Sequence, residues 1–306
     1  MIGIVLNPVA GGGKALKKLP EIKNFFRSLK VPFELRISKM KGECLAIARY
    51  FAEKGYSAVV AAGGDGTVNE VGQPLVGTKT AISVIPLGTG NDYFKALFCK
   101  LNWKDIICQG LIQRVVARVD VGFLKCRGLE RHFFNGMGIG IDSQVLYNLE
   151  KMSFLRFFGE DVIYLASIIK SFLRYRPPEF VVTAKDFYRK GRFFFFNIGC
   201  GQFLAGGLKL FPMANFRDGL LDLSLIERVS FLKLLFKIPK VFHGRHLGEK
   251  EVFYRQISEA KVHVDGPFAL QMDGELVEGC GGWLHIVSVP QSLNVLGYSG
   301  AKDPAC

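Results

Sequence analysis

Short apolar runs alternate with longer amphipathic stretches in the first part of the chain. The runs read IGIVLN, PFELRIS, SAVVAAG and AISVIPLG, and helix-like patterns lie between them at 16–29, at 43–54 and from residue 67 onward. Alternation of apolar strands with amphipathic helices is typical of a parallel sheet covered by helices. We therefore predict a βαβαβαβ order and an N-terminal α/β domain.

The pattern changes near residue 121, after which strand-like runs dominate. These runs read DVGFLKC, RHFFNGMGIG, EFVVTAK, GRFFFFNIGC, GLLDLSLIE, AKVHVD, FALQMDGE and WLHIVSV, with helical patterns near 143–175 and 230–247. A chain of 306 residues, 49% of them hydrophobic, is long and apolar enough for two compact domains. We predict an α/β domain over 1–121 and a β-rich, antiparallel, sandwich-like domain with helical insertions over 122–306, whose last residues return to the first domain.

A glycine-rich loop follows the third apolar run. Gly63, Gly64 and Gly66 surround Asp65 between a predicted strand and a predicted helix. Ligands of open α/β sheets bind outside the carboxyl ends of the strands, and free N–H groups at a helix start favour phosphate. A glycine turn with an aspartate cap would show the same letters. A carboxylate beside phosphate, however, favours a divalent cation, so the loop indicates Mg²⁺ with a nucleotide.

Two further loops leave neighbouring predicted strands in the same way. The first, NPVAGGGK at 7–14, lacks the spacing and the hydroxyl residue of a Walker A loop, but it can bring Lys14 and backbone donors to phosphate. The second, PLGTGND at 86–92, places Thr89, Asn91 and Asp92 at the start of a predicted helix. Capping of that helix and ligand binding are both compatible with these residues.

The three loops together resemble the catalytic domain shared by diacylglycerol kinases, sphingosine kinases and ceramide kinases, and the bacterial soluble lipid kinases match in size. GGDGT alone also resembles NAD kinases and phosphofructokinases. The resemblance implies an ATP-dependent lipid kinase that uses ATP and Mg²⁺. Many relatives have a threonine at the position of Ser38. Serine has the same hydroxyl group, so the contact with the nucleotide is expected to be kept. The residues implied to bind the nucleotide are Asn7, Gly11, Lys14, Ser38, Gly63, Gly64, Asp65, Gly66, Thr67, Asn69, Thr89 and Asn91.

The resemblance extends to later segments and implies further roles. Asp120, in VDVG, would join Asp65 and Asp92 in organising the catalytic Mg²⁺. The segment DGLLDL would hold a second, structural Mg²⁺ through Asp218 and the carbonyl groups of Asn215 and Leu220. Glu275, in MDGE, would be the general base and Asp65 a further catalytic residue. The residue types alone are also compatible with simpler structures: a cap at a strand end for Asp120, a turn for DGLLDL and a hairpin for MDGE.

The net charge and the stretches that mix basic and aromatic residues suggest which partners the protein binds. The 40 Lys+Arg against 27 Asp+Glu give a formal charge of +13, which favours polyanions. Basic, phenylalanine-rich stretches at 154–158, 168–176 and 231–240 suit an anionic membrane surface, although helices packed on a sheet with snorkelling lysines look the same. No nucleic-acid module is recognised. We expect a lipid substrate and peripheral association with an anionic membrane surface. A second copy of the chain, in a homodimer, is a further candidate partner.

The seven cysteines include no CxxC pair, and we predict reduced thiols in a cytosol. The N-terminus lacks the features of a signal peptide, and no apolar run approaches the ~18 residues of a membrane span. We therefore expect a cytoplasmic, peripherally membrane-associated enzyme. An NAD-kinase-like small-molecule kinase and a non-catalytic lipid- or nucleotide-binding relative stay open as alternatives.

Overall fold

The computed structural model describes residues 1–151, 167 and 170–300. Contacts within the chain divide it into two units, each of which is compact. Unit 1 comprises Met1–Val121, Asn215–Gly219 and Val289–Cys306, and unit 2 comprises Gly122–Ala214 and Leu220–Ser288. The sequence pattern placed 215–219 in the second domain, whereas the contacts of this short segment place it in unit 1.

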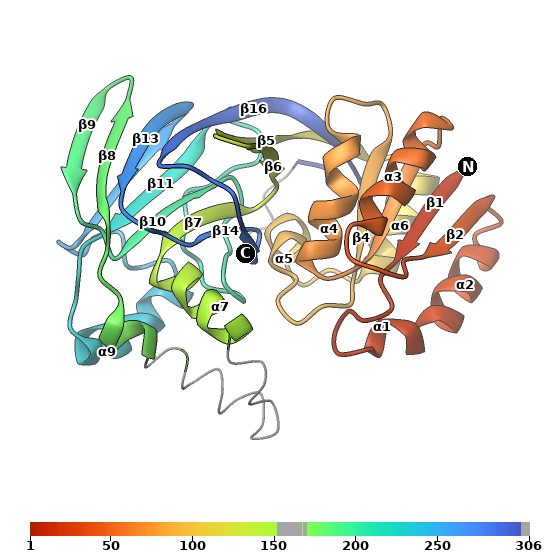
Figure 1. The fold of residues 1–306 in the computed structure, drawn as a ribbon. Coiled ribbons are helices and arrows are strands. Elements are labelled where there is room, and N and C mark those ends of the chain that lie inside the picture. Colours follow the sequence, from red (N-terminus) through yellow and green to blue (C-terminus); the bar gives the residue numbers. More distant parts are fainter. Residues whose placement is uncertain (152–166, 168–169, 301–306) are drawn as a thin grey trace. The chain divides into compact units, whose positions relative to one another are not determined.

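Unit 1 is built on a parallel sheet with the strand order β2-β1-β3-β4, and the end of β16 pairs in parallel with β4 (Figure 1). The predicted α/β fold class is confirmed. The strands are β1 (Ile2–Leu6), β2 (Phe33–Ile37), β3 (Ala58–Gly63), β4 (Ala81–Pro86) and β16 (Trp283–Leu296). The helices are α1 (Lys14–Lys17), α2 (Leu19–Ser28), α3 (Glu43–Glu53), α4 (Asp65–Gly72), the 3₁₀ turn η1 (Gln73–Leu75), α5 (Asp92–Phe98) and α6 (Trp103–Ile112).

The core of unit 1 explains why the strands are apolar along their whole length. All residues of β1 and β3 are buried, because helices cover both faces of a parallel sheet. Ile4, Val60 and Phe26 of this core are 0% exposed. The predicted helix over 16–29 is instead two helices, and Pro20 lies in the first turn of α2. Proline lacks an N–H group and fits the first turn of a helix but not its interior, so a new helix starts there.

Unit 2 contains antiparallel sheets, as predicted. One has the order β12-β11-β10-β7-β14-β15; in the other, β13 pairs with β16 and β8, and β8 pairs with β9 (Figure 1). The strand β5 (Val116–Cys126) begins in unit 1 and ends in unit 2. The other strands of unit 2 are β6 (Leu129–Phe133), β7 (Gly136–Gly140), β8 (Glu179–Ala184), β9 (Phe187–Gly191), β10 (Phe195–Gly199), β11 (Leu221–Ile226), β12 (Val252–Ile257), β13 (Glu259–Asp265), β14 (Leu270–Met272) and β15 (Glu275–Val277).

Two helices of unit 2, α7 (Ile141–Lys151) and α9 (Phe231–Phe242), contribute Ile141, Val145 and Leu234 to a cluster around the buried Phe194. The basic stretch 154–158 and residues 168–169 lie outside the described residues. In α9 the three lysines pair with Glu249 and Glu251 at 2.6–2.8 Å. Phe236 on the same helix is 80% exposed. The lysines of α9 are therefore partly neutralised within unit 2.

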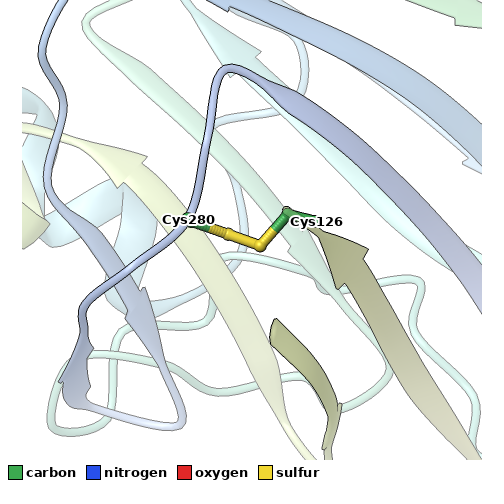
Figure 2. The surroundings of a disulfide bond; sticks show 2 residues. All are labelled: Cys126 and Cys280. Atoms are coloured by element: carbon green, nitrogen blue, oxygen red, sulfur yellow. A yellow bond between two sulfur atoms is a disulfide. The ribbon is translucent and has the colours of Figure 1, made fainter. Parts of the chain in front are cut away.

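A disulfide joins Cys126, at the end of β5, to Cys280, which follows β15 (Figure 2). The two Cα atoms are 5.6 Å apart, within the usual range for this bond. The prediction of reduced thiols is therefore wrong at these two positions, whose separation of 154 residues hid their proximity. It is wrong at Cys99 too, which is also disulfide-bonded. Cys44, Cys108 and Cys200 are free. Within the described parts of the chain, no helix is both long and apolar enough to span a bilayer.

Candidate functional site

The predicted nucleotide loops of unit 1 begin at the same edge of the parallel sheet. Leu6 of β1 is in register with Ile37 of β2 and Ala62 of β3, and Gly63 is in register with Pro86 of β4. The residues that follow these strands therefore leave side by side. This arrangement brings together the loops that contain Asn7, Ser38, Gly63 and Leu87, as the sequence analysis expected for a ligand at the carboxyl ends of the strands.

Direct contacts hold these loops together. The Asn7 side chain donates a hydrogen bond to the Thr67 hydroxyl at 3.0 Å. A Cβ atom at Gly11 would lie 2.4 Å from the Leu87 carbonyl oxygen, and one at Gly88 would lie 2.5 Å from the Gly64 Cα atom. Only glycine allows such close approach at these positions. Gly88 was not among the predicted site residues, although its place between Leu87 and Thr89 in the third motif could have suggested it.

Asp65 fixes the third loop as well as its own. Its Oδ1 atom accepts the backbone N–H of Tyr93 at 3.0 Å, and the N–H groups of Asn91 and Asp92 also face this carboxylate. Burial raises the pKa of Asp65, and these backbone donors oppose the shift. Asp65 thus caps the start of α5 from a neighbouring loop. The capping expected from the sequence is different: Asn91 is the N-cap residue of α5, but its side chain makes no capping hydrogen bond, and α4 has no side-chain cap. The side chain of Asp92 is itself buried and lies 3.9 Å from the Lys95 ammonium group.

Asn91 orders the backbone between β4 and α5. Its φ of +52° is in the left-handed region, and its side chain both accepts from the Gly88 N–H and donates to the Gly88 carbonyl at 2.9 Å. Thr89 and Lys14 are exposed, whereas Ser38 is buried. Asn69 is buried too, and it accepts a hydrogen bond from Gln73 within the same helical region. This contact points to a structural role for Asn69.

Asp120 lies beside the segment that the sequence assigned to a separate cation site. Its two carboxylate oxygens accept the backbone N–H groups of Gln291 and Gly219, each at 2.7 Å. Its own N–H donates to the Phe216 carbonyl, also at 2.7 Å. Burial and the nearby Asp218 carboxylate raise the pKa of Asp120. The predicted catalytic Asp120 and the predicted structural Asp218 are therefore neighbours.

The Phe216 ring connects this segment to α5, because it packs edge-on against Tyr93 with ring centroids 5.7 Å apart. Among the described residues, no three His, Cys, Asp or Glu side chains gather into a preformed cation site. Mg²⁺ commonly binds one or two carboxylates together with water and substrate phosphates, so Asp65 and Asp92 fit such a site. Asp120 and Asp218 also fit a cation, because a positive charge would relieve their mutual repulsion.

The proposed general base, Glu275, lies in unit 2 at the start of β15. It is opposite Met272 in a hairpin whose two turn residues are Asp273 and Gly274. One Glu275 carboxylate oxygen is 3.8 Å from the Arg131 guanidinium group, and both side chains are partly exposed. No motif in the sequence predicted a role for Asp273 or Arg131. An aspartate before glycine predicts a hairpin turn, but neither residue type reveals its distant partners.

Comparisons with known proteins agree with this description. Residues 1–124 match the model of the diacylglycerol kinase catalytic domain, and residues 136–297 match that of the YegS C-terminal NAD kinase beta sandwich-like domain. A diacylglycerol kinase of Bacillus subtilis (strain 168) is 24% identical over 276 residues, covering 89% of this chain and 88% of the relative.

Solved structures show the same fold. A diacylglycerol kinase of Bacillus anthracis str. Sterne aligns with a TM-score of 0.67 at 18% identity, covering 99% of this chain and 97% of the other. An NAD kinase of Archaeoglobus fulgidus, solved in complex with ATP, aligns with a TM-score of 0.52 at 13% identity, with coverages of 97% and 93%. The chain belongs to the family in which a diacylglycerol kinase catalytic domain is followed by a YegS-type beta sandwich-like domain.

Proposed function

We propose that this protein is a lipid kinase that transfers the γ-phosphate of ATP to a hydroxyl group of diacylglycerol or a related lipid. The observation that carries the proposal is the contact between three loops, around Asn7, Asp65 and Asn91, in a segment that matches a diacylglycerol kinase catalytic domain. Phosphoryl transfer depends mainly on positioning and on neutralising phosphate charge, and loops of this kind supply both.

The residues of unit 1 would hold the nucleotide. The backbone N–H groups of the glycine loops and the exposed Lys14 are suited to the phosphates. Asp65 and Asp92 would hold Mg²⁺, which when bound neutralises phosphate charge and orients the γ-phosphate. Asp120, together with Asp218, would bind the second cation or extend this network. The buried Ser38 hydroxyl would contact the nucleoside.

Glu275 would accept the proton of the attacking hydroxyl group. In that step the lipid oxygen forms a bond to the γ-phosphorus, the bond from the γ-phosphorus to the β,γ-bridging oxygen breaks, and ADP leaves. A carboxylate can accept this proton when the proton is transferred late in the step. The guanidinium group of Arg131 lies 3.8 Å from the Glu275 carboxylate and helps to orient it.

The lipid substrate makes an anionic membrane surface the expected partner. Support comes from the net charge of +13 and from Phe236 on α9, which exposes 80% of its surface. An exposed aromatic side chain on a lysine-containing helix suits the interface of a bilayer. A cytoplasmic, peripheral location and a homodimer belong to the same proposal.

A radiolabelled-ATP assay against diacylglycerol, monoacylglycerol, sphingosine, ceramide, phosphatidylglycerol and NAD tests this function. Mg²⁺-dependent labelling of diacylglycerol or a related lipid is the expected result. Labelling of NAD alone would replace the proposal with an NAD kinase activity, which the fold similarity to an NAD kinase supports as the second candidate. ATP binding without labelling of any acceptor would indicate a non-catalytic binding protein.

A further inference from the structure

The turn that precedes Glu275 has an unusual backbone. Asp273 has φ of +50° and Gly274 has φ of +85°, so both turn residues are left-handed, as in a type I′ hairpin. Glycine adopts this conformation freely, but aspartate does so only with support from its surroundings. The Gln271 side chain gives part of that support, because its oxygen accepts the Gly274 N–H at 3.0 Å.

The Asp273 carboxylate provides a second anchor. One oxygen accepts the backbone N–H groups of Asn135 and Gly136 at 2.8 and 3.0 Å, and the other accepts that of Phe134 at 2.9 Å. The Asp273 N–H in turn donates to the Gly136 carbonyl at 2.8 Å. Asp273 is only 6% exposed, so these charge-assisted bonds form away from water and are strong.

The anchored segment, 134–136, joins β6 to β7, and β6 also carries Arg131, which faces Glu275. The hairpin is therefore held to the β6–β7 region at two points that flank Gly274. Loss of the Asp273 contacts would leave consecutive N–H groups buried without their acceptor and would free the turn to move. Glu275 is two residues away, so its carboxylate would move with it.

We propose that Asp273 is a positioning residue that fixes the Glu275 carboxylate by holding the 134–136 backbone. This inference rests on the proposed role of Glu275 as general base. Asp273 acts through Glu275 and needs no contact with substrate. A displacement of about 1 Å at a reacting group can lower a rate by roughly 10²-fold, which sets the scale of the expected effect.

The test combines kinetics with amide hydrogen exchange on the full chain. Asp273→Asn keeps the side-chain shape but turns an amide N–H₂ toward backbone donors. We expect kcat to fall about 10–100-fold while the KM for ATP stays within about twofold. Exchange at 134–136 should become faster. Asp222→Asn is the matched control, because Asp222 is a buried carboxylate of the same sheet that binds Tyr254, and it should leave kcat unchanged.

A double variant distinguishes positioning from general stability. If Asp273 acts only through Glu275, Asp273→Asn combined with Glu275→Gln should be no slower than Glu275→Gln alone. If the double variant loses the product of the two single-variant factors in kcat, or if folded Asp273→Asn has an unchanged kcat, the positioning role is overturned. The general-base role of Glu275 would not be affected by either result. An unchanged kcat for Glu275→Gln would overturn the general base of the proposed function, and the positioning role with it. The exchange data would still show whether Asp273 holds the backbone.

Discussion

Asp65, Asp120 and Asp273 share one kind of chemistry at the residue scale. Each carboxylate accepts backbone N–H groups from a segment distant in the sequence: the start of α5, the residues Gly219 and Gln291, and the segment 134–136. Hydrogen bonds to a charged acceptor are stronger than neutral ones. These aspartates therefore join loops as well as carrying charge, so substitutions at them test both roles.

Asp65→Asn should lower kcat by roughly 10²–10³-fold, because it removes a negative charge from the proposed Mg²⁺ site. The protein should stay folded with a lowered melting temperature, because asparagine keeps an oxygen for the Tyr93 N–H but turns an amide group toward the other backbone donors. Steady-state kinetics at saturating Mg²⁺ and thermal melting check this prediction. Asp105→Asn, at an exposed acid in the first turn of α6, is the control. A fully active Asp65→Asn would show that the loop is only structural.

At the scale of elements, α9 combines paired charges with an exposed ring. Its lysines form short ion pairs that hold the pKa of Glu249 and Glu251 at about 2, so these carboxylates are charged at neutral pH. The positive face that the sequence predicted is thus reduced within unit 2. The Phe236 ring, in contrast, is 80% exposed. Membrane contact through this helix should depend more on the ring than on the lysines.

Phe236→Ser should therefore weaken binding to anionic vesicles more than Lys233→Ala does. Burying an aromatic side chain contributes about 1.5–3 kcal/mol, whereas a lysine near an anionic surface contributes about 1 kcal/mol before its carboxylate partner is considered. Co-sedimentation with vesicles of increasing anionic lipid content measures both. Tyr188→Ser changes an aromatic residue that is 62% exposed on β9, and it controls for general loss of surface aromatics. Equal binding by Phe236→Ser and the wild type would exclude α9 from the interface.

The disulfide between Cys126 and Cys280 connects two elements, the β5–β6 hairpin and the loop after β15. Cys280→Ser should lower the free energy of unfolding by about 2–5 kcal/mol, because the bond closes a long loop. Chemical denaturation with and without a dithiol reductant measures the change. Reduction should destabilise the wild type more than it destabilises Cys280→Ser, in which Cys99 keeps its disulfide bond but the Cys126–Cys280 bond is already absent. Cys108→Ser, at a free cysteine, should behave like the wild type in both conditions.

For the whole molecule, the short segment Asn215–Gly219 matters because it belongs to unit 1 while the residues on either side belong to unit 2. Asp120 binds this segment through Gly219, and burial, with a smaller contribution from the Asp218 carboxylate, raises the pKa of Asp120. A carboxyl group whose pKa is higher in the folded state costs stability once the pH exceeds its unfolded value. Without a cation, the free energy of unfolding should therefore fall as the pH rises from the pKa of Asp120 in the unfolded chain to its higher pKa in the folded protein.

Asp218→Asn tests this coupling through melting temperatures. In a chelator the variant should be at least as stable as the wild type, because a repulsive charge is gone. In Mg²⁺ the wild type should gain stability by mass action, and Asp218→Asn should lose most of that gain. Glu227→Gln, at an exposed acid of unit 2, should retain it. An undiminished Mg²⁺ effect in Asp218→Asn would exclude this segment as a cation site.

Local patterns in the sequence were enough to predict the family, the two fold classes and the order of the glycine-rich loops, because apolar periodicity and glycine motifs are local properties of the chain. They also predicted roles for Asp65, Asn91 and Glu275, since these lie within such motifs, and those roles stay predictions. Only the tertiary structure decided which distant groups meet: Asp120 with 215–219, Asp273 with 134–136, and Cys126 with Cys280. These partners lie far apart along the chain, and strand register with burial, which no local pattern encodes, brings them together.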